Sequence, residues 1–278
     1  MKKHLLLTIL AAGMSGPSLA LDNAVPSCYD SKLGIRPAAV GTELFLLVDQ
    51  TTVFDQVLQQ QVANSARPFM RADHAFSVVT FSAFSQGRYT QVLSSGTIEP
   101  AIGQRSRDDI SKPVLAKYDA CARRQPQLAM QAIGAALREA FSGASGDLAK
   151  SDVIGSFKSI SARVKQSSAR RKVVLIASDM LENSSVTAFY GSKGQSVRMI
   201  DPGKELKLAA DNDMLGDFGG AQIYVIGAGL LAPDAGKNAK YRDPKTMRAL
   251  SAFWNGYFQK SNATVVEIGQ PALLNEMR

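Results

Sequence analysis

Four short, uninterrupted apolar runs constrain the fold of this chain more than any other feature. They are ELFLLVD, KVVLIASD, AQIYVIGAG and ATVVEIG, beginning at residues 43, 172, 221 and 263. A strand that is buried on both faces does not alternate polar and apolar residues, so such runs are typical of strands inside a parallel sheet. Segments of helical periodicity lie between the runs, for example LAMQAIGAALREAF from Leu128. This alternation predicts a parallel sheet with helices on both faces.

One segment breaks the alternation. Residues 74–93 contain two strand-like runs joined by SQG, a pattern typical of a hairpin. We therefore predict an α/β fold: a Rossmann-like, doubly wound, mostly parallel sheet of about six strands, with one antiparallel edge strand and helices on both faces. Residues 94–126 and 183–201 lack clear periodicity, and we interpret both as long loops.

The first twenty residues have the features of an export signal. Two lysines precede an apolar core over 5–12, and small residues follow at Ser18 and Ala20. Cleavage after Ala20 leaves an N-terminal extension over 21–41 and one domain over 42–278, in a periplasmic or secreted protein. Lipid attachment at Cys28 is the alternative. No later stretch is long and apolar enough for a stable membrane span.

The cysteines and charges narrow the possible partners. Cys28 and Cys121 are the only cysteines, and an oxidising compartment favours a disulfide between them, with two buried thiols as the alternative. His74 is the only histidine after cleavage, which excludes a Cys/His metal cluster. The net charge of +8 is modest, and the densest basic cluster, residues 169–172, has no aromatic neighbours, so we expect no nucleic-acid partner.

Polar side chains end two of the apolar runs. Asp49 and Asp179 stand at the ends of the runs, with Thr51 after the first and Ser178 before the second. The carboxyl ends of parallel strands share one edge of a sheet, which is where ligands bind. Carboxylates with neighbouring hydroxyls suit Mg²⁺. The competing interpretation is helix capping, with residues 52–55 forming a capping box.

These segments together resemble a von Willebrand factor A-type domain over residues 42–269. The resemblance lies in LFLLVDQTT, FSVVTFS, AIGAALREAF, VVLIASD and GAQIYVIGAG. Such domains hold a metal ion through an Asp-x-Ser-x-Ser loop, a threonine from a second loop and an aspartate after the fourth strand. The resemblance makes Asp49, Thr51 and Asp179 the metal ligands, with Gln131 near the second-loop threonine. Val53 replaces the second serine and has no lone pair.

The resemblance thus implies a degenerate adhesion site for Mg²⁺, Mn²⁺ or Ca²⁺, with Ser178 as a further weak ligand. We expect a protein-interaction module rather than an enzyme, because no Gly-x-Ser-x-Gly motif is present and His74 lies away from the site. Phe189, Tyr190 and Arg198 are the expected contacts to an envelope protein. In the alternative, the two aromatic residues cover the core of their own loop.

Two other functions stay open. A magnesium-dependent phosphatase would use Asp49 as its nucleophile and Asp179 as a metal ligand, but Thr51 stands where that family has a second aspartate. A structural subunit of an envelope, secretion or conjugation assembly would dock without exchanging a ligand.

Overall fold

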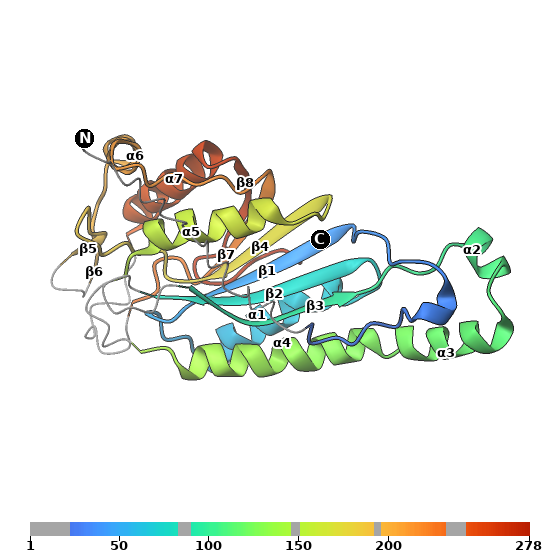
Figure 1. The fold of residues 1–278 in the computed structure, drawn as a ribbon. Coiled ribbons are helices and arrows are strands. Elements are labelled where there is room, and N and C mark those ends of the chain that lie inside the picture. Colours follow the sequence, from blue (N-terminus) through green and yellow to red (C-terminus); the bar gives the residue numbers. More distant parts are fainter. Residues whose placement is uncertain (1–22, 83–89, 146–150, 192–195, 232–242) are drawn as a thin grey trace, which may run out of the picture.

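The main sheet has six strands in the order β3-β2-β1-β4-β7-β8, and only β3 runs antiparallel to its neighbour (Figure 1). The computed structural model describes residues 23–82, 90–145, 151–191, 196–231 and 243–278, so the expected export signal lies outside the described residues. The strands are β1 (Thr42–Asp49), β2 (His74–Phe81), β3 (Thr90–Ile98), β4 (Arg171–Ala177), β7 (Ala221–Ile226) and β8 (Ala263–Ile268). The antiparallel pairing expected for the predicted hairpin is confirmed in β2 and β3, while its SQG connection, residues 85–87, lies outside the described residues.

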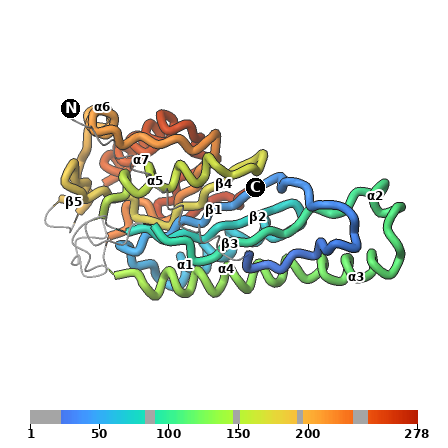
Figure 2. The backbone as a smooth tube through the Cα atoms, in the orientation of Figure 1, coloured from blue at the N-terminus to red at the C-terminus, as the bar shows by residue number. Residues whose placement is uncertain are grey.

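Helices cover both faces of the sheet (Figures 1 and 2). One face carries α5 (Val153–Gln166), α6 (Pro202–Asp211) and α7 (Pro244–Lys260), and the other carries α1 (Gln56–Ala66) and α4 (Gln125–Ser142). The predicted class is therefore confirmed: a doubly wound α/β fold with a mostly parallel sheet of six strands, one antiparallel edge strand and helices on both faces.

The side chains of β1 alternate between two cores, which explains its uninterrupted apolar run. Phe45 and Leu47 pack in the core that contains α5 and α7, while Leu44, Leu46 and Val48 pack in the core that contains α1 and α4. Because both faces of the strand are buried, its first polar side chain after Glu43 comes only at its last residue.

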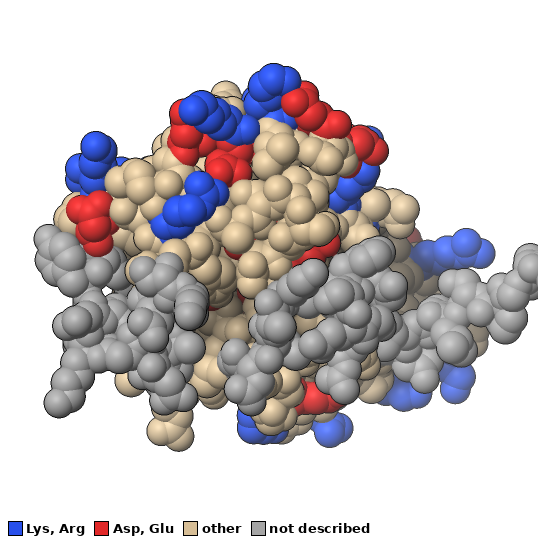
Figure 3. All heavy atoms as spheres, turned by 90° about the vertical axis from the view of Figure 1, so that its left-hand side faces the viewer, with Lys and Arg blue, Asp and Glu red and all other residues tan. Residues whose placement is uncertain are grey.

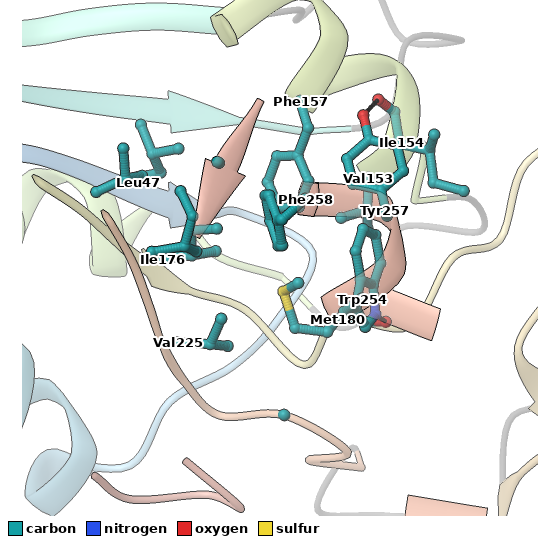
Figure 4. Packing of buried hydrophobic residues seen from close by; sticks show 14 of the residues in the cluster. Leu47, Val153, Ile154, Phe157, Ile176, Met180, Val225, Trp254, Tyr257 and Phe258 are labelled. Carbon is teal, nitrogen blue, oxygen red and sulfur yellow. Dashed lines mark hydrogen bonds between the residues drawn. The ribbon is translucent and has the colours of Figure 1, made fainter. Parts of the chain in front are cut away.

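An aromatic cluster fills the first core and reaches the end of β4 (Figure 4). The rings of Phe157 and Trp254 pack edge to face with centroids 5.5 Å apart. The Trp254 indole also donates a hydrogen bond of 2.9 Å to the carbonyl oxygen of Met180, in the turn that follows β4. The packing of α7 thereby fixes the position of that turn.

Residues 94–126 do not form the long loop that we predicted. β3 continues to Ile98, and α2 (Gln104–Asp108), α3 (Lys112–Ala122) and the start of α4 follow. The sequence of these helices shows no apolar periodicity, because α3 buries only Tyr118 and α2 buries no residue. A helix without a buried apolar stripe has no periodic signal in its sequence.

The disulfide between Cys28 and Cys121 is confirmed, and it joins the N-terminal segment to α3. Cys28, Leu33, Ile102 and Tyr118 form a small third core around this disulfide. It includes part of a short 3-10 helix, Ser31–Leu33. In Figures 1 and 2 this region stands beyond the amino edge of the sheet, at the end of the molecule opposite β5 and β6.

The second predicted loop, 183–201, is also partly ordered. Its described residues contain two short paired strands, β5 (Tyr190–Gly191) and β6 (Ser196–Val197), and α6 begins directly after it. In the part of the chain that the structure describes, no helix has the length and apolar character needed to cross a membrane.

Candidate functional site

Asp49 and Ser178 meet at the carboxyl edge of the sheet, between the two central strands. β1 and β4 are parallel neighbours, with Val48 paired to Ala177, so the next residue of each strand faces the other. The connections after β1 and β4 lead to opposite sides of the sheet, which makes this the switch point where open α/β sheets bind ligands. The Ser178 hydroxyl donates a 2.6 Å hydrogen bond to Asp49 Oδ2.

Both carboxylate oxygens of Asp49 are already occupied by hydrogen bonds within the protein. Oδ1 accepts from the Thr51 amide at 2.8 Å and from its hydroxyl at 2.6 Å. Oδ2 accepts from Ser178 and, at 3.4 Å, from the Thr52 hydroxyl. The Asp49 side chain has no exposed surface. Ser151, which precedes α5, joins the group through its Oγ, 2.9 Å from Thr51 Oγ1.

Asp179 is held beside Asp49 in a similar way. Its Oδ1 accepts a 2.8 Å hydrogen bond from the Leu181 amide, and its Oδ2 accepts one of 2.5 Å from the Tyr190 hydroxyl. The Asp179 amide donates to the Thr52 hydroxyl at 3.2 Å, so this threonine links the two aspartates. The ends of the two apolar runs predict that both carboxyls lie at one edge of the sheet, and the structure brings them together there.

The turn after Asp179 has an unusual backbone. Met180 has φ of 59°, a left-handed conformation that costs a residue with a side chain about 1–2 kcal/mol. Its amide donates to Ser178 Oγ, and its carbonyl oxygen accepts from Trp254. Such conformations persist where the surroundings hold them in place, and they cluster at functional sites.

Burial dominates the acid–base properties of the pair. Burial and, as the second cause, the nearby Asp49 carboxyl together raise the pKa of Asp179 to about 8, against the hydrogen bond from Tyr190. Burial also raises the pKa of Asp49, opposed by the hydrogen bonds from Ser178 and Thr51. Two buried carboxyls this close do not both ionise readily, so the pair retains a proton near neutral pH.

A third buried carboxyl, Glu182, lies on the same segment. Its Oε2 accepts a 2.9 Å hydrogen bond from the Ile154 amide in the first turn of α5. Its Oε1 is buried without a hydrogen-bond partner among the described residues. Burial raises the pKa of Glu182 to about 8. The segment that follows β4 therefore carries two carboxyls that favour the protonated form.

The oxygen donors have the chemistry that Mg²⁺ prefers, but their arrangement does not fit a tightly held ion. Each oxygen of Asp49 and Asp179 already accepts a hydrogen bond from the protein. The described residues contain no group of three or more acidic, histidine or cysteine side chains that could hold a metal. A cation would have to displace the Tyr190 hydroxyl from Asp179, or a hydroxyl from Asp49.

Two expectations about the surrounding residues are wrong. Gln131 is exposed in the first half of α4, about 16 Å along the helix from Ser142 at its other end. It is Ser145, beyond that end, whose amide bonds to the Gln50 carbonyl in the Asp49 loop. The capping box over 52–55 is also wrong, because Asp55 is itself the N-cap of α1 and accepts from the Leu58 amide.

The expected partner contacts have structural roles instead. Phe189 is fully buried and packs edge to face on Phe253 with ring centroids 5.0 Å apart, so it offers no surface to a partner. The Tyr190 hydroxyl is engaged by Asp179. Arg198 bonds to the Ala188 carbonyl and the Glu205 carboxylate, both at 2.7 Å. For Phe189, the alternative prediction is the correct one: its ring covers the core beneath its own loop.

Sequence reasoning missed three polar members of the site: Ser151, the Tyr190 hydroxyl and Glu182. Glu182 carried a signal, since a carboxylate three residues after a strand-end aspartate is unusual for a buried segment. No sequence signal marked Ser151, because its position depends on the bridge that it forms with Asn183.

No family model and no curated protein matches the chain. Among solved structures, an aerotolerance-related membrane protein from Bacteroides fragilis, with multiple mutations to serines, is 12% identical over 83% of this chain and 92% of that chain, with a TM-score of 0.32. Proximal thread matrix protein 1 from the mussel byssus is 11% identical over 83% of this chain, which spans 44% of that protein, with a TM-score of 0.33. Likenesses this small carry no argument.

Proposed function

We propose that this chain is an exported interaction module of the von Willebrand factor A type. In this proposal it binds another protein of the cell envelope through the loops at the carboxyl edge of its sheet. The observation that carries the proposal is the meeting of Asp49, Ser178 and Asp179 at the switch point between β1 and β4. This is where the sequence resemblance places the adhesion site.

In the proposed module, the protein's own hydroxyl groups replace the cation. Ser178 and Thr51 donate to Asp49, and Tyr190 donates to Asp179, so the carboxyl oxygens keep their partners without a metal. Mg²⁺, Mn²⁺ or Ca²⁺ binds weakly at most, because it must first displace one of these donors. The partner is then recognised by the surface of the loops and not by a bridging ion.

The proposed contact surface is the apolar rim next to Asp49. Val53 is 43% exposed between the buried residues Thr52 and Phe54, and Val57 in the first turn of α1 is 77% exposed. Large exposed apolar side chains beside a rigid polar site are typical of a protein-binding surface. Figure 3 shows this edge of the molecule: charged side chains of both signs are mixed over α6 and α7, so no single sign of charge dominates the described part of this face.

A phosphatase is the second candidate for the same residues. The burial of Asp49 argues against it, because a nucleophile whose two oxygens are both hydrogen-bonded cannot reach a phosphate ester unless its loop opens. Hydrolysis of a phosphate monoester in the presence of Mg²⁺, abolished by Asp49→Asn, would support the enzyme and overturn the interaction module.

The interaction surface is tested by capture of partners from envelope extract. We expect Val53→Glu with Val57→Glu to abolish the capture of a partner that the unchanged protein retains. The matched control is Val266→Glu with Leu274→Glu, since both of these residues are exposed apolar side chains elsewhere, 47% and 92% exposed. Equal loss in both double variants would place the contact elsewhere. A partner that stays bound through purification would favour the structural subunit over a transient binder.

A further inference from the structure

A projecting lobe at the amino edge of the sheet has no role in the proposed site. We define the lobe as residues 26–36 and 100–124, which include the Ser31–Leu33 helix, α2 and α3. Figures 1 and 2 place α2 and α3 beyond the amino edge, at the opposite end of the molecule from β5 and β6. The lobe has its own small core, separate from the two cores that cover the sheet.

Several interactions hold the lobe rigid. The Cys28–Cys121 disulfide joins its two segments. The hydroxyls of Tyr29 and Tyr118 both donate to the Pro100 carbonyl, and their rings pack edge to face with centroids 5.4 Å apart. The buried carboxylate of Glu99, the residue directly after β3, accepts a hydrogen bond from the Cys28 amide at 2.8 Å. The lobe is therefore a fixed platform and not a loose extension.

Among the described residues, the excess of positive charge lies in the lobe. It contains eight basic residues against four acidic ones, a net charge of +4, while the other described residues have 16 basic against 17 acidic ones. Two of its basic residues form ion pairs, Arg107 with Asp119 and Lys117 with Asp30. The remaining six are exposed and form no ion pair among the described residues: Lys32, Arg36, Arg105, Lys112, Arg123 and Arg124.

The kind of partner follows from what this surface lacks. The large hydrophobic side chains that are exposed in the described chain all lie outside the lobe. A protein partner normally needs buried aromatic or apolar anchors, and single-stranded nucleic acid needs aromatic side chains on which bases stack, whereas Tyr118 is buried and Tyr29 is half-buried. Binding through charge alone suits a surface of high charge density, such as a bilayer with anionic headgroups.

We propose that this lobe adsorbs to an anionic lipid surface through its unpaired lysines and arginines. The lobe and the Asp49–Asp179 site lie at opposite ends of the strands, so adsorption would direct the carboxyl edge away from the bilayer, where a partner can reach it. Each basic residue near such a surface contributes a factor of about five to the partition coefficient. Salt should weaken the association, because the charges are exposed.

The test is sedimentation of the disulfide-bonded protein with vesicles of phosphatidylcholine, with and without phosphatidylglycerol. We expect retention by the anionic vesicles only, loss of retention at about 0.5 M salt, and a partition coefficient reduced about 25-fold by Lys112→Gln with Arg123→Gln. The control Lys245→Gln with Arg248→Gln removes the same charge from the first two turns of α7 and should change retention little.

Four results would overturn the proposal: no retention at low salt, equal retention by neutral vesicles, equal losses in the two double variants, or tighter binding to duplex DNA than to anionic vesicles. The first two remove the charge-driven membrane contact. Equal losses in the two double variants would show that the membrane contact does not lie in the lobe. Tighter binding to DNA would identify nucleic acid as the polyanion that the lobe binds. Circular dichroism of both double variants checks that the fold is kept.

Discussion

The Tyr190 hydroxyl lies 2.5 Å from Asp179 Oδ2, so a loop residue occupies the carboxylate oxygen that the family resemblance assigns to a metal ion. This contact ties the segment after β4 to the end of that strand. It also supplies a donor to a buried carboxyl that lies beside the Asp49 carboxyl. The hydrogen bond therefore stabilises the loop and the acid pair together.

Removing the Tyr190 hydroxyl should destabilise the protein. Tyr190→Phe leaves Asp179 Oδ2 without this donor, and an unsatisfied buried acceptor costs about 1–3 kcal/mol of the free energy of unfolding. Urea denaturation measures the loss. In an Asp179→Asn background, the same substitution should cost less, because the bond is no longer made to a carboxyl group. Equal costs in the two backgrounds would show that the contact contributes nothing specific.

The protein should lose stability as the pH rises from 7 to 8. The folded-state pKa of Asp179 and of Glu182 is about 8, well above the usual value for an unfolded chain, so the folded state binds more protons in this range. Each such group lowers the free energy of unfolding by up to about 1.4 kcal/mol per pH unit until its folded pKa is passed. The measurement starts at pH 7 because burial also lowers the pKa of His74. Below pH 7 this histidine makes the free energy of unfolding rise with pH, which would oppose the effect of the two carboxyls.

Glu182→Gln separates the two carboxyl groups in that experiment. The amide keeps the size of the side chain but does not ionise, so the variant should show a shallower fall in stability between pH 7 and pH 8 than the unchanged protein. Chemical denaturation at the two pH values gives both slopes. A slope that stays the same would mean that Glu182 does not titrate in this range.

Phe189→Ala should behave as a core substitution. The ring is fully buried against Phe253 and Trp254, so its removal should cost about 3–5 kcal/mol of the free energy of unfolding. Val53→Ala, at the exposed rim, should change it by less than about 0.5 kcal/mol. Thermal unfolding of the two variants compares them directly. A small effect of Phe189→Ala would restore this residue as a candidate partner contact.

The disulfide should stabilise the lobe without being required for the sheet. Cys28→Ser with Cys121→Ser opens a loop that spans 93 residues, for which chain entropy predicts a loss of up to about 4–5 kcal/mol. The two main cores contain neither cysteine, so far-ultraviolet circular dichroism should still report the folded sheet. Denaturation with and without reductant measures the loss. Complete unfolding of the double variant at room temperature would contradict the separation of the lobe from the sheet.

How much the sequence could predict depends on whether a residue's position follows from a regular strand. Asp49 and Asp179 were placed correctly because strand ends in a parallel sheet share an edge. The position of Tyr190 beside Asp179 could not be predicted, since the path of its segment depends on the burial of Phe189 and on the ion pair of Arg198 with Glu205. Gln131 was misplaced because a helix alone does not specify which residue reaches the site.

The central claim is that the acid pair is satisfied by the protein's own hydrogen bonds and not by a cation. Isothermal titration of Mg²⁺, Mn²⁺ and Ca²⁺ into the unchanged protein and into Tyr190→Phe tests it most directly. We predict no measurable heat with the unchanged protein and weak binding once the Tyr190 hydroxyl is gone. Tight binding of any of the three ions to the unchanged protein, lost in Asp49→Asn, would contradict the claim.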